Sequence, residues 1–323
     1  MSPQRNSLKL SHAIEGMILE KRADGKSLNT ISNYRVAFKK LQLFLGADPP
    51  LRAITREQLV AFFAWLRDDY ISEPDGVAPR GQIKLSGKTR RNIHTDLSAL
   101  WTWAVAGGHV DRNIIRSISA PSFEDPVIIP LAREEIEALL KACEHTAVSS
   151  HRPTAERDRL IVRLLLDTGI RAQELCDITI GDLNLAANTI KVTGKGRKQR
   201  IVYFGRRTAK SLWVYLAPRI TTAKPTNPLI LVEDRNDPRP MTRNVLGHLL
   251  RRMGRRAGIA NVHPHRFRHT FATNYLRNGG MESVLQDLLG HSDPEMVRRY
   301  AHLVESDRAA DHAQASPVDN WRL

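Results

Sequence analysis

The sequence predicts a mainly α-helical protein of two domains, the second of which contains a small antiparallel three-stranded sheet. Apolar residues recur at helical spacing along most of the chain. Residues 183–204 instead form a short β-rich region in which glycines are placed for a tight hairpin. Residues 119–130 read SAPSFEDPVIIP, with three prolines and no helical period, which predicts an interdomain linker. The 323 residues are enough for two separate cores.

The first domain, residues 1–118, is expected to be an all-helical bundle with basic helix faces. Residues 8–46 carry two amphipathic helices, the second opened by Ser27 and closed by Gly46. Thr55, followed three residues later by Gln58, has the pattern of a capping box for a third helix. Residues 71–86 are rich in Gly, Pro and Ser and predict a loop. A fourth helix from Lys88 to Ala106 turns an apolar stripe inward that comprises Leu97, Leu100, Trp101 and Ala104.

The second domain, residues 131–323, begins with two helices and continues into the β region. Its other elements are a buried strand, a helix capped by Thr242 that ends near Gly258, and a helix whose first turn holds Pro264. The expected helices and strands are 134–143, 155–168, 183–185, 189–192, 200–204 and 229–232.

Net charge is the strongest global clue to function. The chain has 49 basic and 34 acidic residues, a net charge of +15, and a pI near 10.2. Between Asp237 and Glu282 there is no acidic residue and no lysine, yet nine arginines occur there. The planar guanidinium group binds phosphate oxygens in pairs, so this run favours a nucleic-acid backbone over a merely well-solvated surface.

Other functional classes are disfavoured by what the sequence lacks. No apolar run approaches the length of a membrane span, and the N-terminus has no apolar block of a signal peptide. Cys143 and Cys176 lie in apolar helical patterns and predict buried free thiols. We therefore expect a protein of the reducing cytoplasm, associated with the nucleoid and not with a membrane.

Residues 262–300 hold two polar clusters that are placed for chemistry. His265 and Arg268 are three apart and share one face of the helix that Pro264 begins. A second cluster joins His291, in a turn, to Tyr300, in a following helix capped by Ser292 or Asp293. A tight helix–turn–helix would gather these side chains at one place.

Two further cations stand out earlier in the chain. Arg171 opens a helix after Gly169 among apolar neighbours and needs an anion, which is either Glu174 one turn on or a phosphate. The spacing alone does not decide between a simple ion pair and an arginine that Glu174 aims at a phosphate. Lys195 lies between two glycines at a hairpin tip, a position that is most often only solvated. The hairpin lacks the spacing of a nucleotide-binding P-loop.

These motifs occur together in an order that resembles the tyrosine recombinases of the phage integrase family. The matching text is TGIRAQEL, VTGKGRKQR, HPHRFRHTFAT and LLGHSDPEMVRRY. The resemblance extends over nearly the whole chain and is closest in size to the short, Xer-like or mobile-element members. It implies a helical core-binding domain with a SAM-like bundle, followed by a mixed α/β catalytic domain. Ala132, where a capping Thr is frequent, and Asn113-Ile114, where Asn-Pro is frequent, depart from the family pattern without touching its chemistry.

The resemblance implies a site-specific DNA recombinase for integration, excision or resolution. Tyr300 would attack the scissile phosphorus and form a 3′-phosphotyrosine link with release of a 5′-hydroxyl. Arg171, Arg268 and His291 would stabilise the charge on the non-bridging oxygens, and Lys195 would protonate the leaving oxygen. His265 would accept the proton of Tyr300 or position the phosphate. No metal or other cofactor is expected; His265 and His269 have the spacing of zinc ligands, but the glutamate of that motif is missing and Arg266 intervenes.

The expected partners are a double-stranded recombination site and three further copies of the chain, with the tail after Tyr300 exchanged between subunits; accessory proteins are a further class that the resemblance allows. Two alternatives use the same fold: a type IB topoisomerase, and a catalytically silent DNA-binding regulator. An intact Tyr300 with both arginines argues against the regulator. A metal-dependent nuclease is disfavoured because no carboxylate cluster accompanies the histidines.

Overall fold

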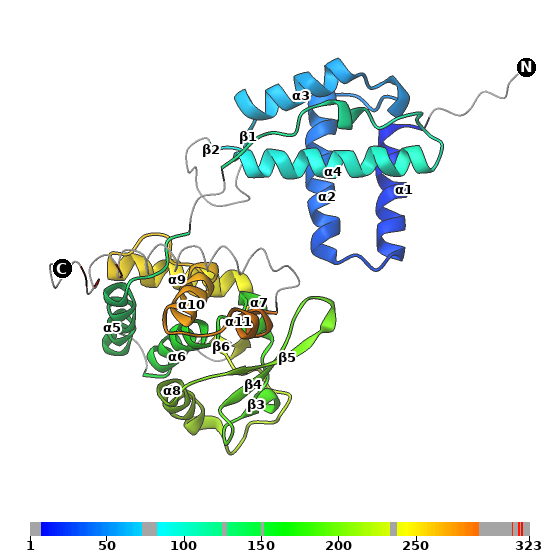
Figure 1. The fold of residues 1–323 in the computed structure, drawn as a ribbon. Helices are drawn as coiled ribbons and strands as arrows, with labels where there is room; N and C mark the ends of the chain where they lie inside the picture. The colour runs from blue at the N-terminus through cyan, green and yellow to red at the C-terminus, as the bar shows by residue number, and fades with distance from the viewer. Residues whose placement is uncertain are drawn as a thin grey trace, which may run out of the picture. The chain divides into compact units, whose positions relative to one another are not determined.

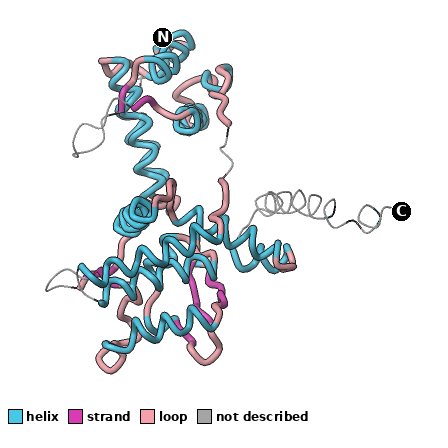
Figure 2. The backbone as a smooth tube through the Cα atoms, turned by 90° about the vertical axis from the view of Figure 1, so that its left-hand side faces the viewer, coloured by secondary structure: helices cyan, strands magenta, loops and turns pink. Residues whose placement is uncertain are grey.

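The chain divides into two compact units, Met1–Pro126 and Val127–Leu323, each of which is described separately. The computed structural model describes residues 8–72, 83–124, 128–149, 152–232 and 238–290, together with His312, Ser316 and Val318. Both units are mainly helical, and strands are few and short (Figures 1 and 2). The expected fold class is therefore confirmed. No helix in these described ranges has the length and apolar character needed to cross a bilayer.

The first unit is a four-helix bundle in which α4 contacts α1 and α2 and runs across them (Figure 1). Its helices are α1 (Leu10–Ala23), α2 (Leu28–Leu45), α3 (Arg56–Asp68) and α4 (Gly87–Ala106), with short 3-10 turns η1 (Leu51–Ala53) and η2 (Ile114–Ser117). The predicted caps are confirmed. Ser27 accepts a hydrogen bond from the Thr30 amide, Thr55 and Gln58 form a capping box, and Gly46 ends α2 with a positive φ of 63°.

The core of this unit draws on every helix and on the turn after α4. Trp101 and Phe62 are fully buried, as are Leu97 and Leu100 on the predicted inner face of α4. Residues 71–86, predicted as a loop, contain a two-residue antiparallel ladder between β1 (Ile71–Ser72) and β2 (Ile83–Lys84). The prediction missed this ladder because two-residue strands have no period to detect.

The second unit packs helices around a small three-stranded sheet. Its helices are α5 (Arg133–Ser149), α6 (Arg152–Thr168), α7 (Ala172–Asp177), α8 (Arg206–Leu216), α9 (Arg243–Ala257), α10 (Pro264–Arg277) and α11 (Glu282–Leu289). The 3-10 turns are η3 (Ile180–Asp182), η4 (Lys195–Arg197) and η5 (Ala217–Arg219). The predicted bounds of α9 are confirmed, since Thr242 caps it and Gly258 ends it at φ 71°. Cys143 and Cys176 are buried and free, as predicted.

The sheet has the order β3-β4-β5 and is antiparallel throughout. Its strands are β3 (Leu183–Asn184), β4 (Thr189–Thr193) and β5 (Gln199–Tyr203). Thr193 pairs with Gln199, so the β4–β5 hairpin turns through residues 194–198. Gly196 has φ 72°, a conformation that glycine adopts at little cost.

The predicted buried strand at residues 229–232 is shorter than expected. Only β6 (Leu231–Val232) pairs, with β7 (Arg239–Pro240), whereas Leu229 and Ile230 are buried without being in a ladder. The continuous apolar run at residues 229–232 therefore reflects the burial of these side chains and not a four-residue strand. The main core of the unit joins α6, the sheet and α9, and Phe267 of α10 is fully buried in it.

Candidate active site

Arg171 is the N-cap residue of α7 and lies where α6 has just ended at Gly169. Its backbone amide donates to Oε2 of Glu174 at 2.8 Å, and its Nη1 donates to Oε1 of the same carboxylate at 2.9 Å. Its Nη2 donates to the carbonyl of Gly290 at 3.2 Å. The side chain stays 41% exposed, so the ion pair with Glu174 fixes the guanidinium group without burying it.

Glu174 is almost fully buried and also binds a second arginine. Arg200 of β5 donates from Nη1 and Nη2 to the two carboxylate oxygens, each at 2.8 Å. Burial alone would raise the pKa of Glu174, but hydrogen bonds from Arg200 and Arg171 lower this pKa to about 2. The carboxylate is therefore charged at physiological pH and holds two cations side by side.

Arg268 lies on α10 and is 2% exposed. Its Nη1 donates to the carbonyl of Gly169 at 2.8 Å, and its Nη2 donates to the carbonyl of Leu289 at 2.6 Å. These bonds tie α10 to the end of α6 and to the end of α11. The guanidinium group is therefore held between two chain segments that are far apart in sequence.

His265 is exposed one turn before Arg268 and contacts His269. The two Nε2 atoms lie 3.2 Å apart and the rings meet edge to face, with centroids 4.6 Å apart. His269 thus lies directly against His265 and orients its ring. The pair offers two nitrogen donors, but the described residues contain no group of three or more His, Cys, Asp or Glu side chains placed to hold a metal.

A cleft of about 460 Å³ brings Arg171, Arg268 and His265 together. It lies between the first turns of α7 and α10 and one face of α9. The cationic or titratable side chains that line it are Arg171, Arg243, Arg251, Arg268, His248, His263 and His265. No carboxylate lines the cleft among the residues that the structure describes. Such a lining suits a phosphodiester, whose charge is negative and whose oxygens only accept hydrogen bonds.

His263 has a structural role at the rim of this cleft. It caps α10, and its Nδ1 accepts a hydrogen bond from the Arg266 amide at 3.3 Å. Burial, together with the charge of Arg266, lowers the pKa of His263 below its ordinary value. His263 is therefore a neutral cap at physiological pH.

Of the other predicted site residues, some lie in the described part of the chain and some lie outside it. Lys195 lies in η4 of the β4–β5 hairpin, as predicted. His291 and Tyr300 lie outside the described residues, although the chain is described up to Gly290, immediately before His291. Arg200 was not singled out from the sequence. It is the last residue of the matching text VTGKGRKQR, which assigned no role to it.

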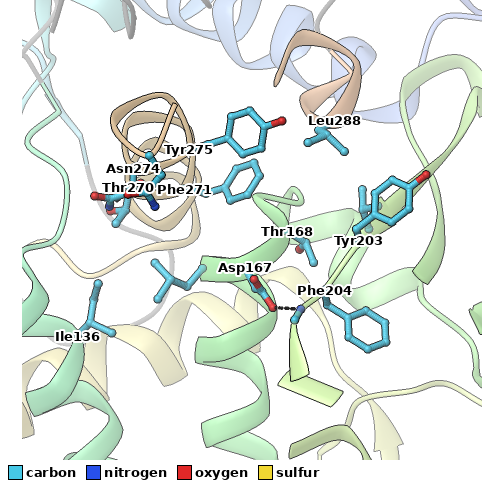
Figure 3. A pocket seen from close by; sticks show the side chains of 14 residues that line it. Ile136, Asp167, Thr168, Tyr203, Phe204, Thr270, Phe271, Asn274, Tyr275 and Leu288 are labelled. Atoms are coloured by element: carbon cyan, nitrogen blue, oxygen red, sulfur yellow. Dashed lines mark hydrogen bonds between the residues drawn. The ribbon is translucent and has the colours of Figure 1, made fainter. Parts of the chain in front are cut away.

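A second pocket of similar size has the opposite character (Figure 3). The aromatic side chains that line it are Phe271 and Tyr275 of α10, Tyr203 of β5 and the adjoining Phe204. Its described lining contains no arginine, lysine or histidine, and its charged member is Asp167, which accepts a hydrogen bond from the Gly205 amide. A phosphate would meet like charge there, so this pocket is not the phosphate site.

Comparison with known proteins identifies the chain. Residues 130–306 match the model described as "Phage integrase family", and residues 11–119 match the "Phage integrase SAM-like domain". The chain belongs to the phage integrase family. The tyrosine recombinase XerD of Staphylococcus haemolyticus is 30% identical to this recombinase over 298 residues, which are 91% of the chain and 94% of that relative.

Two solved structures share the fold of the recombinase. One is the XerH site-specific recombinase bound to a palindromic difH substrate after cleavage, with a TM-score of 0.69, 21% identity, and coverage of 96% of this chain and 85% of that one. The other is a λ integrase tetramer bound to a Holliday junction, with a TM-score of 0.69, 20% identity, and coverage of 91% and 80%. The predictions of a tyrosine recombinase and of site-specific recombination are confirmed.

Proposed function

We propose that this recombinase cuts and rejoins DNA at the cleft between α7, α9 and α10, with Tyr300 as nucleophile. Tyr300 displaces the 5′-oxygen from the scissile phosphorus and becomes linked to the 3′-phosphate; attack by a 5′-hydroxyl of the partner strand then releases it. The covalent link conserves the energy of the phosphodiester, so joining needs no external supply.

The side chains around the phosphate divide the remaining chemistry. Arg171 and Arg268 bind the non-bridging oxygens, where negative charge grows in the transition state, and His291 donates a further hydrogen bond. Lys195 gives a proton to the departing 5′-oxygen. His265 faces the same phosphate and either positions it or takes the proton of Tyr300.

One observation carries this proposal. Arg171 and Arg268 come from different helices, yet both line one cleft with His265, and both donate to successive carbonyls immediately before His291. A simple ion pair between Arg171 and Glu174 does not explain why a second, buried arginine lines the same cleft. A phosphate between the two guanidinium groups does.

The proposal is tested by trapping the covalent adduct. Protein incubated with fragmented host DNA in EDTA is denatured and recovered, and sequencing of the attached DNA locates the site. A nicked duplex carrying that site then gives a stable adduct, because the short released strand diffuses away. The Tyr300→Phe variant should bind this duplex with the same affinity and form no adduct. Adduct formation by that variant would show that another residue is the nucleophile.

Assembly and domain roles extend the same proposal. Residues 1–118 form the core-binding domain, residues 119–130 the linker, and residues 131–323 the catalytic domain with its tail. Four copies act on two duplexes in the cytoplasm, at the nucleoid, and the tail after Tyr300 docks on a neighbouring subunit; accessory proteins direct the outcome. The relatives' names favour recombination over a type IB topoisomerase. A plasmid carrying two sites should accordingly give deletion or inversion products and not only relaxed circles.

A further inference from the structure

Arg200 uses each of its three guanidinium nitrogens on a different acceptor. Nη1 and Nη2 donate to the two oxygens of Glu174, and Nε donates to the carbonyl of Leu288 at 2.7 Å. The side chain is 14% exposed, and it does not line the phosphate cleft. Arg200 therefore contacts the site only through other residues.

Three arginines meet at the C-terminal end of α11. Arg200, Arg268 and Arg171 donate to the carbonyls of Leu288, Leu289 and Gly290 respectively, so each of three successive carbonyls accepts from a different guanidinium group. The last carbonyls of a helix lack intrahelical partners and form the negative end of its dipole. The end of α11, immediately before His291, is thus fixed by cations that come from β5, α10 and the start of α7.

Two glycines pack closely against the ion pair between Arg200 and Glu174. A Cβ at Gly290 would lie 3.1 Å from Nη1 of Arg200, and a Cβ at Gly194 would lie 3.3 Å from Oε1 of Glu174. Gly290 directly precedes His291, and Gly194 directly precedes Lys195. The same ion pair is therefore the surface on which two segments bearing proposed catalytic residues rest.

We infer that Arg200 is a positioning residue of the recombinase: it holds Arg171, through Glu174, and the end of α11 in the register that the reaction requires. Only a planar guanidinium group reaches both oxygens of one carboxylate and a backbone carbonyl at once. An ammonium group at this position would keep the charge but lose the simultaneous contacts. This inference rests on the proposed function, because it assigns Arg200 an effect on DNA cleavage.

The test compares covalent trapping by Arg200→Met, Arg200→Lys and the wild-type protein on the nicked duplex. Methionine keeps the aliphatic length and removes all the hydrogen bonds. We expect Arg200→Met to trap about 100-fold more slowly, the loss that a small misplacement of reacting groups produces. Arg200→Lys should regain about 10-fold of that loss, since it keeps the charge beside Glu174.

Arg219→Met is the matched structural control. Arg219 is also half-buried and donates to two backbone carbonyls, those of Pro228 and Leu229, away from the cleft. Arg200→Met should lower the melting temperature more than Arg219→Met, because it leaves the buried carboxylate of Glu174 with one arginine partner. Rates are therefore expressed per folded molecule, and only Arg200→Met should lose trapping.

A duplex with a methylphosphonate at the scissile position distinguishes a positioning role of Arg200 from a merely structural one. Replacing one charged oxygen by methyl reduces the charge that Arg171 must stabilise, so the deficit of Arg200→Met should shrink from about 100-fold to about 10-fold. A rate within about twofold of the Arg219→Met control, or a deficit that the methylphosphonate leaves unchanged, overturns the inference. Failure of the wild-type protein to trap contradicts the proposed function instead.

Discussion

At the scale of single residues, the site depends on a buried carboxylate that is more than compensated by cations. Glu174 is 3% exposed and accepts hydrogen bonds from two guanidinium groups and one amide. A buried charge is tolerated when its partners satisfy it, and removing it leaves those partners unpaired. Arg171 and Arg200 would then repel each other across the position that the carboxylate occupied.

This arrangement predicts a pH-dependent contribution to stability. The pKa of Glu174 falls from an ordinary value of 4.5 to about 2 in the folded protein. A lowered pKa stabilises the fold above the unfolded-state pKa, and that contribution disappears as pH falls through the folded-state pKa. Glu174→Gln should therefore be destabilised relative to wild type at pH 6. The difference in unfolding free energy should shrink by about 3 kcal/mol between pH 5 and pH 2.

Denaturant titrations at several pH values measure this difference. Glu137→Gln is the matched control, because Glu137 pairs with Arg133 at 2.9 Å but remains 61% exposed. An exposed pair contributes little, so the control should stay within about 1 kcal/mol of wild type at every pH. A constant difference between Glu174→Gln and wild type from pH 6 to pH 2 would contradict the assigned role of the carboxylate.

Some of these residues could be predicted from the sequence and others could not, and each outcome has a physical reason. Arg171 was predicted because a charge beside apolar neighbours at a helix start needs an anion, and Glu174 lies one turn away. Arg200 occupies an ordinary alternating position of a strand, and its partner Leu288 is 88 residues away. Only the fold brings them together, so no local pattern marks it.

At the scale of elements, the end of α6 is as important for the site as the helices that carry its arginines. Gly169 ends α6 with φ 59°, and its carbonyl accepts from Nη1 of Arg268. A Cβ at this position would lie 2.9 Å from Cγ of Phe271, closer than carbon atoms pack. The turn therefore requires glycine both for its conformation and for space.

Gly169→Ala should lower the free energy of unfolding by about 3 kcal/mol, from left-handed strain of about 1 kcal/mol plus overpacking against Phe271. Gly258→Ala provides the control, because Gly258 has φ 71° and open space around its Cβ position. It should lose only the conformational part, about 1 kcal/mol. Thermal and urea unfolding of the two variants measure both losses, and equal losses would show that Phe271 does not restrict this turn.

Helices were predicted best where a capping residue precedes apolar residues that recur at helical spacing. Thr55 with Gln58, Ser27, Thr242 and Pro264 each mark a helix start that the structure confirms. Two predicted bounds were wrong: the helix predicted to end at Cys143 continues to Ser149, and the strand predicted at 229–232 forms a ladder only at Leu231 and Val232. A helix end that a capping residue marks is a local event, whereas a strand end depends on a partner elsewhere in the chain.

At the scale of the whole molecule, each unit has its own core, and four arginines line the cleft where the phosphate would lie. The core of the first unit draws on residues 10–118, and those of the second on residues 131–289. Net charge was readable from composition, but its position was not. The structure shows that α9 turns Arg243 and Arg251 into the cleft beside Arg171 and Arg268.

This placement predicts how salt weakens DNA binding. Each arginine that neutralises a phosphate releases counterions. The slope of log K against log salt concentration should therefore fall in magnitude by about 0.9 in Arg243→Gln, and by about the same amount in Arg251→Gln. Arg133→Gln makes the same change in net charge on exposed α5, paired with Glu137 and outside the cleft. If the slope reflects contacts in the cleft, fluorescence anisotropy on one duplex from 50 to 200 mM salt will leave Arg133→Gln at the wild-type slope. Equal effects of all three substitutions would mean that the recombinase senses DNA through its overall charge, and that α9 does not contact the backbone.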